Sequence, residues 1–119
     1  MKRRIRLRRH GDFQAVMSGK RFFSGKTLVG FAVPNQQEAN RVGVTVSRSL
    51  KSAVDRNRAR RRLRELVRIT LLGADSPLTG VGIRYDVVLI ARPAALELPF
   101  ADLAAEAEQA ALRLSKLSS

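Results

Sequence analysis

The arginines between residues 54 and 68 are the side chains of this sequence whose type and spacing could do chemistry. The segment reads VDRNRARRRLRELVR, and a helix at 100° per residue would place its apolar side chains on one face centred on Leu63. The opposite stripe would hold Asn57, Arg61, Arg64 and Arg68. Arg58 would flank this stripe on one side and Arg60 on the other, with Arg56 further round toward the core. The pattern predicts a helix that is buried on one side and cationic on the other.

Phosphate binding is the chemistry that this arginine run predicts. A guanidinium group presents a planar fork of donors that matches phosphate oxygens and can also stack on bases. Arginines on a rigid helix lose less conformational entropy per contact than arginines on a flexible tail. The amide of Asn57 either reads a base edge or a sugar hydroxyl, or caps locally, or is simply exposed. Two blander interpretations are a solvated basic face without a partner and a membrane-surface helix, although the apolar face lacks interfacial Trp.

Composition supports a polyanionic partner and excludes several other functions. The chain has 119 residues, enough for one domain, and its net charge is +13. The absence of cysteine excludes thiolate metal sites, and His10, the single histidine, excludes a site with two histidine ligands. We therefore expect no metal or cofactor bound by the protein itself. No apolar run approaches the ~20 residues of a membrane helix, so we expect no membrane contact and a cytoplasmic location.

Hydrophobic periodicity predicts an α+β fold. Helices are expected at 11–18, about 49–72 and 99–117, and strands at 27–33, 41–47 and 85–91. The first two strands are close enough to form an antiparallel hairpin, and the nearly continuous apolar run at 85–91 suits a central strand. Residues 20–26 and 73–84 are interpreted as loops. We predict one domain over residues 1–119, an α/β sandwich with a mixed sheet of about four strands and three helices.

Charged residues outside the basic helix are also unevenly placed. Residues 1–9 form a basic arm, which is either a solvated tail or a segment that orders on RNA. The last helix would carry its acids on the outward face, away from the basic helix: Asp102, Glu106 and Glu108. The remaining scattered aspartates are interpreted as helix caps or exposed residues: Asp12, Asp55 and Asp86.

The order of residues around the arginine run is more specific than its charge. RVGVTVSRSLKSAVDRNRARRRLRE contains a valine-rich strand ending in Ser, a short turn, and then Ala-Val-x-Arg-Asn-Arg-x-(Arg/Lys)-Arg. LRRHGDFQAV precedes this block, and YDVVLIARPAA follows it at a distance. Together these segments closely resemble the protein subunit of bacterial ribonuclease P, over nearly the whole chain from Leu7 to the last helix. The extended block with its flanks carries the resemblance, not the RNR tripeptide alone.

The resemblance implies a division of labour between protein and RNA. The catalyst would be the ribonuclease P RNA, which uses Mg²⁺ to hydrolyse a phosphodiester bond and free the 5′ end of mature tRNA. The protein would be a non-catalytic subunit that binds this RNA and the precursor tRNA, with no obligate protein partner. The resemblance also implies a left-handed βαβ crossover, which general handedness rules would not predict.

The resemblance assigns two sets of site residues. RNA binding falls on Arg56, Asn57, Arg58, Arg60, Arg61 and Arg64, and the helical stripe adds Arg68. A cleft between the sheet and the first helix, for the 5′ leader of precursor tRNA, falls on Phe13, Met17, Phe31, Thr45 and Ser47, with Arg92 near its edge. Family members often have an aromatic residue in place of Met17, which can still make a soft apolar contact. From the residues alone, Phe13 and Phe31 fit a core as well as a cleft.

Three other functions compete with this one. A structural RNA-binding protein, such as a small ribosomal protein, fits the composition equally well. A self-sufficient nuclease is disfavoured because no carboxylate cluster or histidine pair suggests acid–base or metal chemistry. A sequence-specific DNA reader lacks a helix-turn-helix or zinc pattern. The extended block and the candidate cleft favour the ribonuclease P protein.

Overall fold

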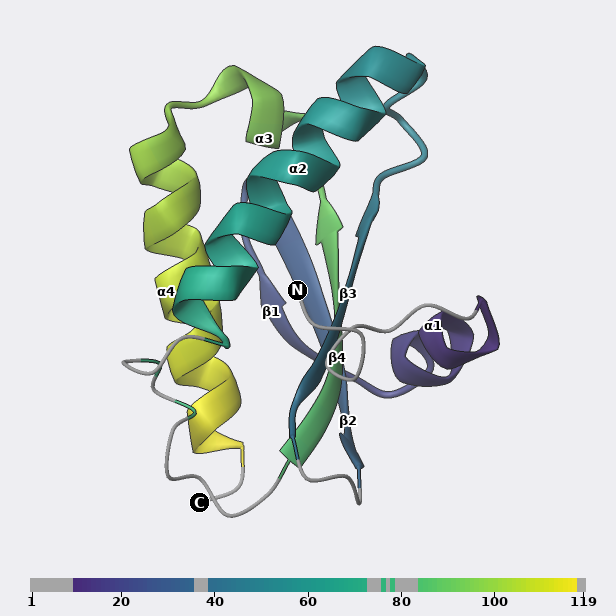
Figure 1. Cartoon of the computed structure of the whole chain (residues 1–119), viewed down its shortest axis with the longest axis vertical. Coiled ribbons are helices and arrows are strands. Elements are labelled where there is room, and N and C mark those ends of the chain that lie inside the picture. Colours follow the sequence, from purple (N-terminus) through teal and green to yellow (C-terminus); the bar gives the residue numbers. More distant parts are fainter. Residues whose placement is uncertain (1–9, 36–38, 73–75, 77, 79–83, 118–119) are drawn as a thin grey trace.

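The computed structural model of the chain describes residues 10–35, 39–72, 76, 78 and 84–117 (Figure 1). The described elements in chain order are α1 (His10–Met17), β1 (Lys20–Ser24), β2 (Leu28–Asn35), β3 (Arg41–Val46), α2 (Ala53–Thr70), β4 (Arg84–Ala91), α3 (Ala94–Glu97) and α4 (Phe100–Lys116). The predicted basic arm at 1–9 and most of the predicted loop at 73–84 lie outside the described residues.

The strands form one mixed sheet in the order β1-β2-β4-β3. β4 lies between β2, to which it is antiparallel, and β3, to which it is parallel. Parallel neighbours cannot be joined by a tight turn, and α2 makes the crossover from β3 to β4. The predicted α+β class and the central position of strand 85–91 are confirmed. The predicted hairpin is wrong, because β4 separates β2 from β3. The hand of the crossover stays a prediction.

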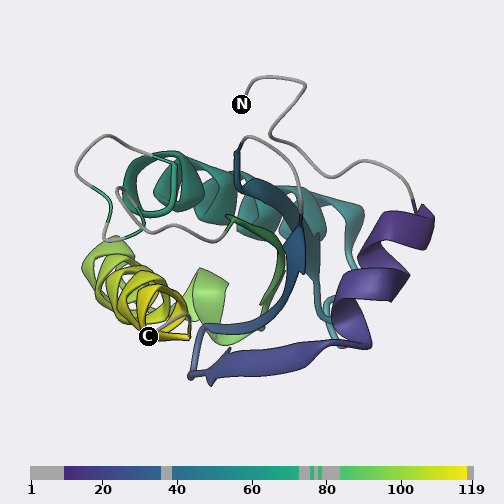
Figure 2. The same ribbon diagram turned by 90° about the horizontal axis from the view of Figure 1, so that it is seen from below.

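The helices cover the two faces of the sheet unequally (Figure 1 and Figure 2). α2 and α4 pack together on one face, while α1 packs alone on the other. Alternate residues of β4 divide between the faces. Val87 and Leu89 enter the large core beneath α2 and α4, whereas Val88 joins Val16 of α1 in a small cluster. The large core therefore anchors the cationic helix, and the small cluster holds α1.

β1 occupies a segment that was expected to be a loop. A bulge in β1 shifts its register with β2, so that Phe22 and Phe23 both enter the core. Their burial therefore does not alternate, and no period-two pattern marks the strand. β2 also runs past the expected stop at Pro34. β1 extends only as far as Ala32 on β2, so Pro34 lies where one side of β2 has no neighbouring strand.

Glu106 was predicted to lie on the outward face of the last helix. Its side chain instead reaches the turn between β1 and β2. Its carboxylate accepts hydrogen bonds from the backbone N–H groups of Lys26 and Thr27, at 2.9 and 3.0 Å, and from the Thr27 hydroxyl at 2.8 Å. Thr27 is 1% exposed, so its donors need an internal acceptor. Gly25 leaves room for the carboxylate, since a Cβ there would lie 2.1 Å from Glu106 Oε1. One acid thus joins α4 to the sheet.

We predict that Glu106→Ala destabilises the fold by about 2 kcal/mol, because the buried donors of Thr27 lose their acceptor. Glu108→Ala is the matched control, since Glu108 is an exposed acid on the same helix. Its stability should stay within about 0.5 kcal/mol of the unaltered chain. Urea unfolding at pH 7 measures both, and equal stability of the two variants would contradict the role given to Glu106.

Candidate nucleic-acid interface

α2 is the long cationic helix that the sequence predicts, and local rules explain its first and last turns. The Ser52 hydroxyl caps the first turn by accepting a hydrogen bond from the Asp55 N–H at 3.4 Å. Asp55, predicted to be a cap or an exposed residue, is therefore a half-buried residue of the first turn, and its charge complements the helix dipole. Arg68 does the same in the last turn. The buried face that orients the helix consists of Ala59, Leu63, Leu66, Val67 and Thr70.

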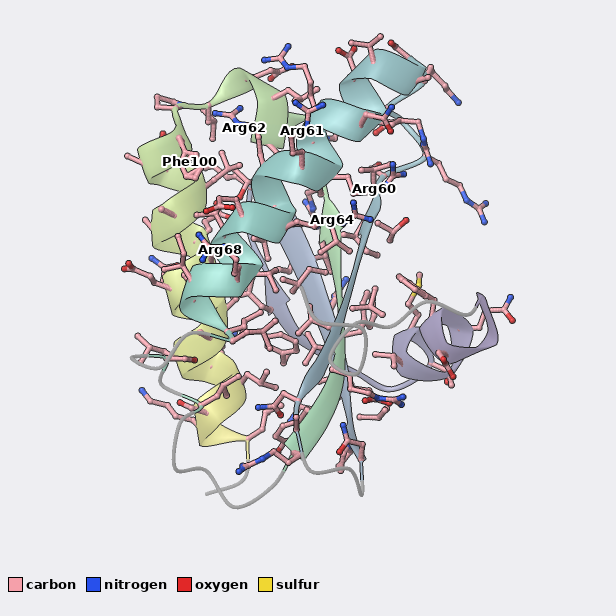
Figure 3. All side chains as sticks on the ribbon, in the orientation of Figure 1. Arg60, Arg61, Arg62, Arg64, Arg68 and Phe100 are labelled. Atoms are coloured by element: carbon pink, nitrogen blue, oxygen red, sulfur yellow. The ribbon has the colours of Figure 1, made fainter. Side chains whose placement is uncertain are left out.

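The predicted polar stripe lies on the outer surface of α2. Its exposed members are Asn57, Arg61 and Arg68, and Arg58, which flanks the stripe, is exposed as well. Arg60 and Arg64 are half-buried and lie on the side of α2 toward β3 (Figure 3). The cationic surface therefore continues around the helix toward the edge of the sheet.

Two contacts on this surface involve its arginines, one with a neutral amide and one with a carboxylate. Arg60 Nη1 donates to Asn57 Oδ1 at 3.0 Å, which orients the amide that interrupts the arginine run. Arg68 Nη2 donates to Glu65 Oε1 at 2.5 Å. This hydrogen bond lowers the pKa of Glu65 from its ordinary value. Both partners are exposed, so the pair adds little to stability and leaves the surface strongly cationic.

Arg56 fastens the connection between β3 and α2. Its Nη1 atom donates to the backbone carbonyl of Leu50 at 2.9 Å and to that of Ser47 at 3.3 Å. Ser47 and Ser49 also contact each other through their hydroxyl oxygens at 2.8 Å. The end of β3 and the start of α2 are therefore held together by side chains as well as by the chain itself.

A groove of about 860 Å³ opens between α1 and α2 over the edge strand β3. Its lining residues are Phe13, Gln14, Met17, Val44, Thr45, Val46, Ser47, Arg48, Arg56, Arg60 and Ile90. The α1 wall is mainly apolar, the α2 wall is cationic, and two residues with hydroxyl groups lie between them, Thr45 of β3 and Ser47 just after it. Apolar groups suit the faces of bases, and guanidinium groups suit phosphates.

The structure brings together four of the six residues predicted for a leader cleft. These are Phe13, Met17, Thr45 and Ser47. Phe31 packs instead against the small cluster beneath α1. Arg92 lies near the turn between β1 and β2, where its Nη2 atom donates to the Ser24 hydroxyl at 3.1 Å. The predicted cleft therefore divides into a groove and two residues that do not line it.

Five lining residues were not assigned to a site from the sequence: Gln14, Val44, Val46, Arg48 and Ile90. Arg48 directly follows Ser47, so its position in the chain was a usable signal. Ile90 reaches the groove because it is the register partner of Thr45 in the parallel pair β3–β4. That pairing could not be read from the sequence, because the two strands are joined by a whole helix.

An apolar and cationic groove beside an arginine-rich helix is the arrangement expected of a protein that binds extended nucleic acid. Within the described ranges, no three His, Cys, Asp or Glu side chains gather as a metal site would require. In the same ranges, no helix combines the length and apolar character needed to cross a bilayer.

Comparison with known proteins places this arrangement in a family. The family model described as Ribonuclease P matches residues 1–115. A ribonuclease P protein component from Chloroflexus aggregans is 40% identical over 107 residues, which cover 89% of this chain and 74% of the relative. Another, from a Roseiflexus species, is 38% identical over 118 residues, 98% of this chain and 91% of the relative. The chain belongs to the ribonuclease P protein family, whose role is tRNA 5′ processing.

Solved structures share the fold. The ribonuclease P protein of Staphylococcus aureus superposes with a TM-score of 0.71 and 23% identity, covering 97% of this chain and 98% of that one. The protein from Thermotoga maritima gives a TM-score of 0.72 and 24% identity, covering 91% and 96%. At this identity the likeness supports the fold, and the sequence relatives support the family.

We predict that Arg56→Ala destabilises the fold by about 1–2 kcal/mol, because two carbonyl groups lose a charged donor. Arg58→Ala is the matched control, as the side chain of Arg58 is exposed and makes no hydrogen bond or ion pair with any described residue. It should leave stability within about 0.5 kcal/mol. Thermal unfolding followed by circular dichroism compares the two, and an Arg56→Ala variant as stable as Arg58→Ala would show that the brace is unimportant.

Proposed function

We propose that this chain is the non-catalytic protein component of a ribonucleoprotein in which a ribonuclease P RNA, with its own Mg²⁺, hydrolyses the phosphodiester bond of precursor tRNA. The observation that carries this proposal is the groove, which shares a cationic wall with the arginine-rich helix. The groove and the outer surface of α2 meet along one helix. Two adjoining surfaces of this kind suit a protein that holds a substrate strand against a second RNA. Membership of the family supports the tRNA-processing role.

The positions of three carboxylates also support a non-catalytic role. Asp86 is neither the helix cap nor the exposed residue that was expected, but lies within β4, is 8% exposed and is paired with Arg41. It accepts hydrogen bonds from Arg41 Nε at 2.8 Å, Arg41 Nη2 at 2.6 Å and Asn35 Nδ2 at 2.7 Å. The hydrogen bonds from Arg41 to Asp86 raise the pKa of Arg41. Glu65 and Glu106 are engaged by Arg68 and by the β1–β2 turn. Each of these acids thus has a structural task.

The outer surface of α2 is the proposed contact with the catalytic RNA. Its side chains offer donors at a spacing fixed by the helix, and phosphates would relieve their repulsion. The proposed contacts are Asn57, Arg58, Arg60, Arg61, Arg64 and Arg68, with the remaining donors of Arg56 at the groove. No base-reading pattern is needed, since the shape and backbone of a folded RNA provide the contacts.

The groove is the proposed position of the 5′ leader. Phe13 and Met17 would contact bases, while Thr45 and Ser47 present a hydroxyl floor toward the sugar–phosphate chain. Phe31 would support the α1 wall from beneath rather than contact the leader. Arg92 lies beyond the groove and would meet only a leader that continues across the sheet. Because mature tRNA lacks a leader, the groove would favour substrate over product.

Reconstituted cleavage tests the proposed function. We expect precursor tRNA to be cut efficiently at low Mg²⁺ only when the protein and a bacterial ribonuclease P RNA are both present, with release of an intact 5′ leader. The protein alone and the RNA alone serve as controls. Binding of the RNA without any stimulation would favour a structural RNA-binding protein. Cleavage by the protein alone would place the chemistry in this chain and contradict the proposal.

We predict that Met17→Glu weakens binding of precursor tRNA to the reconstituted enzyme by about tenfold, because a carboxylate would face leader phosphates. Binding of mature tRNA should not change. Met17 is 41% exposed, so the substitution should not disturb the fold. Leu112→Glu is the matched control, because Leu112 is 48% exposed on α4, away from the groove. Equal losses for precursor and mature tRNA would remove the leader from the groove.

A further inference from the structure

Arg62 differs from its neighbours in the arginine run because its guanidinium group points into the protein. It lies on the side of α2 that faces α3 and the start of α4 (Figure 3). Its Nη1 atom donates to the backbone carbonyl of Ala95 at 2.8 Å. Its Cζ atom lies 5.8 Å from the centroid of the Phe100 ring, within the range of a cation–π interaction. Neither the arginine stripe nor the resemblance to the family assigned a role to this residue.

The acceptor of Arg62 is part of a rigid corner. Ala95 is 2% exposed, and its N–H donates to the carbonyl of Arg92 at 2.8 Å. The N–H of Arg92 donates in turn to the carbonyl of Thr27 at 2.8 Å, where β4 meets the β1–β2 turn. Arg62 therefore joins α2 to the end of the central strand and, through Phe100, to the first residue of α4.

The adjacent residue, Arg61, has the opposite environment. The side chain of Arg61 is exposed and forms no hydrogen bond or ion pair with any residue that the structure describes. The two side chains have the same chemistry and successive positions, yet only that of Arg62 is engaged by the protein. A phosphate contact by Arg62 would have to break its bond to Ala95 and expose a buried carbonyl, which is unfavourable.

We propose that Arg62 is a positioning residue, which binds no phosphate itself but fixes the angle of α2 on the α3–α4 corner so that the outer arginines meet RNA in one orientation. This inference rests on the proposed RNA contact of α2. Contacts made by a preorganised surface lose less entropy on binding than contacts made by a surface that must first be ordered. Loss of Arg62 should therefore weaken binding without changing the number of phosphates contacted.

The salt dependence of RNA binding separates these two roles. Each phosphate contact adds about 0.7–0.9 to the slope of log K against log salt concentration. The dissociation constant for a bacterial ribonuclease P RNA would be measured for the full chain over a series of KCl concentrations at fixed Mg²⁺. The variants are Arg62→Met and Arg61→Met, which remove the same charge from adjacent residues. Arg62→Lys keeps the charge and can still reach a carbonyl, and so tests for rescue.

For Arg61→Met we expect a slope reduced by about 0.7–0.9 and an unchanged Tm. For Arg62→Met we expect an unchanged slope, a dissociation constant raised about fivefold at every salt concentration, and a Tm lowered by about 5 °C. Arg62→Lys should recover part of both losses. The amide resonance of Leu96, which follows the Ala95 carbonyl, should shift in Arg62→Met and not in Arg61→Met.

Two results would overturn the positioning role. A slope reduced in Arg62→Met as much as in Arg61→Met would make Arg62 a phosphate ligand. A lower Tm with unchanged affinity would make its contacts purely stabilising. Failure of the unaltered chain to bind the RNA would overturn the proposed function, and this role with it. The curve of the unaltered chain distinguishes that failure from the other two.

Discussion

Repulsion between arginines is the constraint on which the rest of this structure depends. Seven of them lie between residues 56 and 68, on a helix only 18 residues long. The protein opposes this repulsion by burying the far side of α2 in the large core and by giving several guanidinium groups an oxygen atom. Arg56 and Arg62 donate hydrogen bonds to backbone carbonyls. Arg60 donates to the amide oxygen of Asn57, and Arg68 donates to the carboxylate of Glu65. With these contacts, the fold tolerates the remaining repulsion on the cationic surface of α2 even when no phosphate is bound.

The strand order determines where this surface lies. Because β4 pairs in parallel with β3, the chain must cross over the sheet between them, and the cationic helix is that crossover. β3 is left as an edge strand, and an edge of unpaired backbone groups invites pairing with other chains. Here Arg48 and Arg60 lie along that edge as lining of the groove. The same cations that suit a nucleic acid therefore also discourage strand addition at β3.

The sequence predicted the features that depend on the spacing of neighbouring residues. It did not predict the features that depend on contacts between residues far apart in the chain. The faces of α2 and the central strand β4 were found because three- and four-residue spacing and a long apolar run are properties of adjacent residues. β1 was missed because its bulge buries Phe22 and Phe23 together. The Glu106 clamp on Thr27 joins residues 79 apart and leaves no trace in helical periodicity. Arg61 and Arg62 are the same residue type at adjacent positions, and helical periodicity gave no sign that Arg62 would contact Ala95 and Phe100.

The helix and the groove are not two independent sites, because they share a wall. Arg56 and Arg60 belong to α2 and also line the groove, so a strand lying in the groove and an RNA lying on α2 would approach the same cations. Two polyanions that meet near such cations repel each other less than they would in solvent. Under the proposed function, the protein thus need not recognise either RNA by sequence. It is enough that α1, β3 and α2 are held at fixed distances, which the two cores and the arginine–carbonyl bonds on α2 provide.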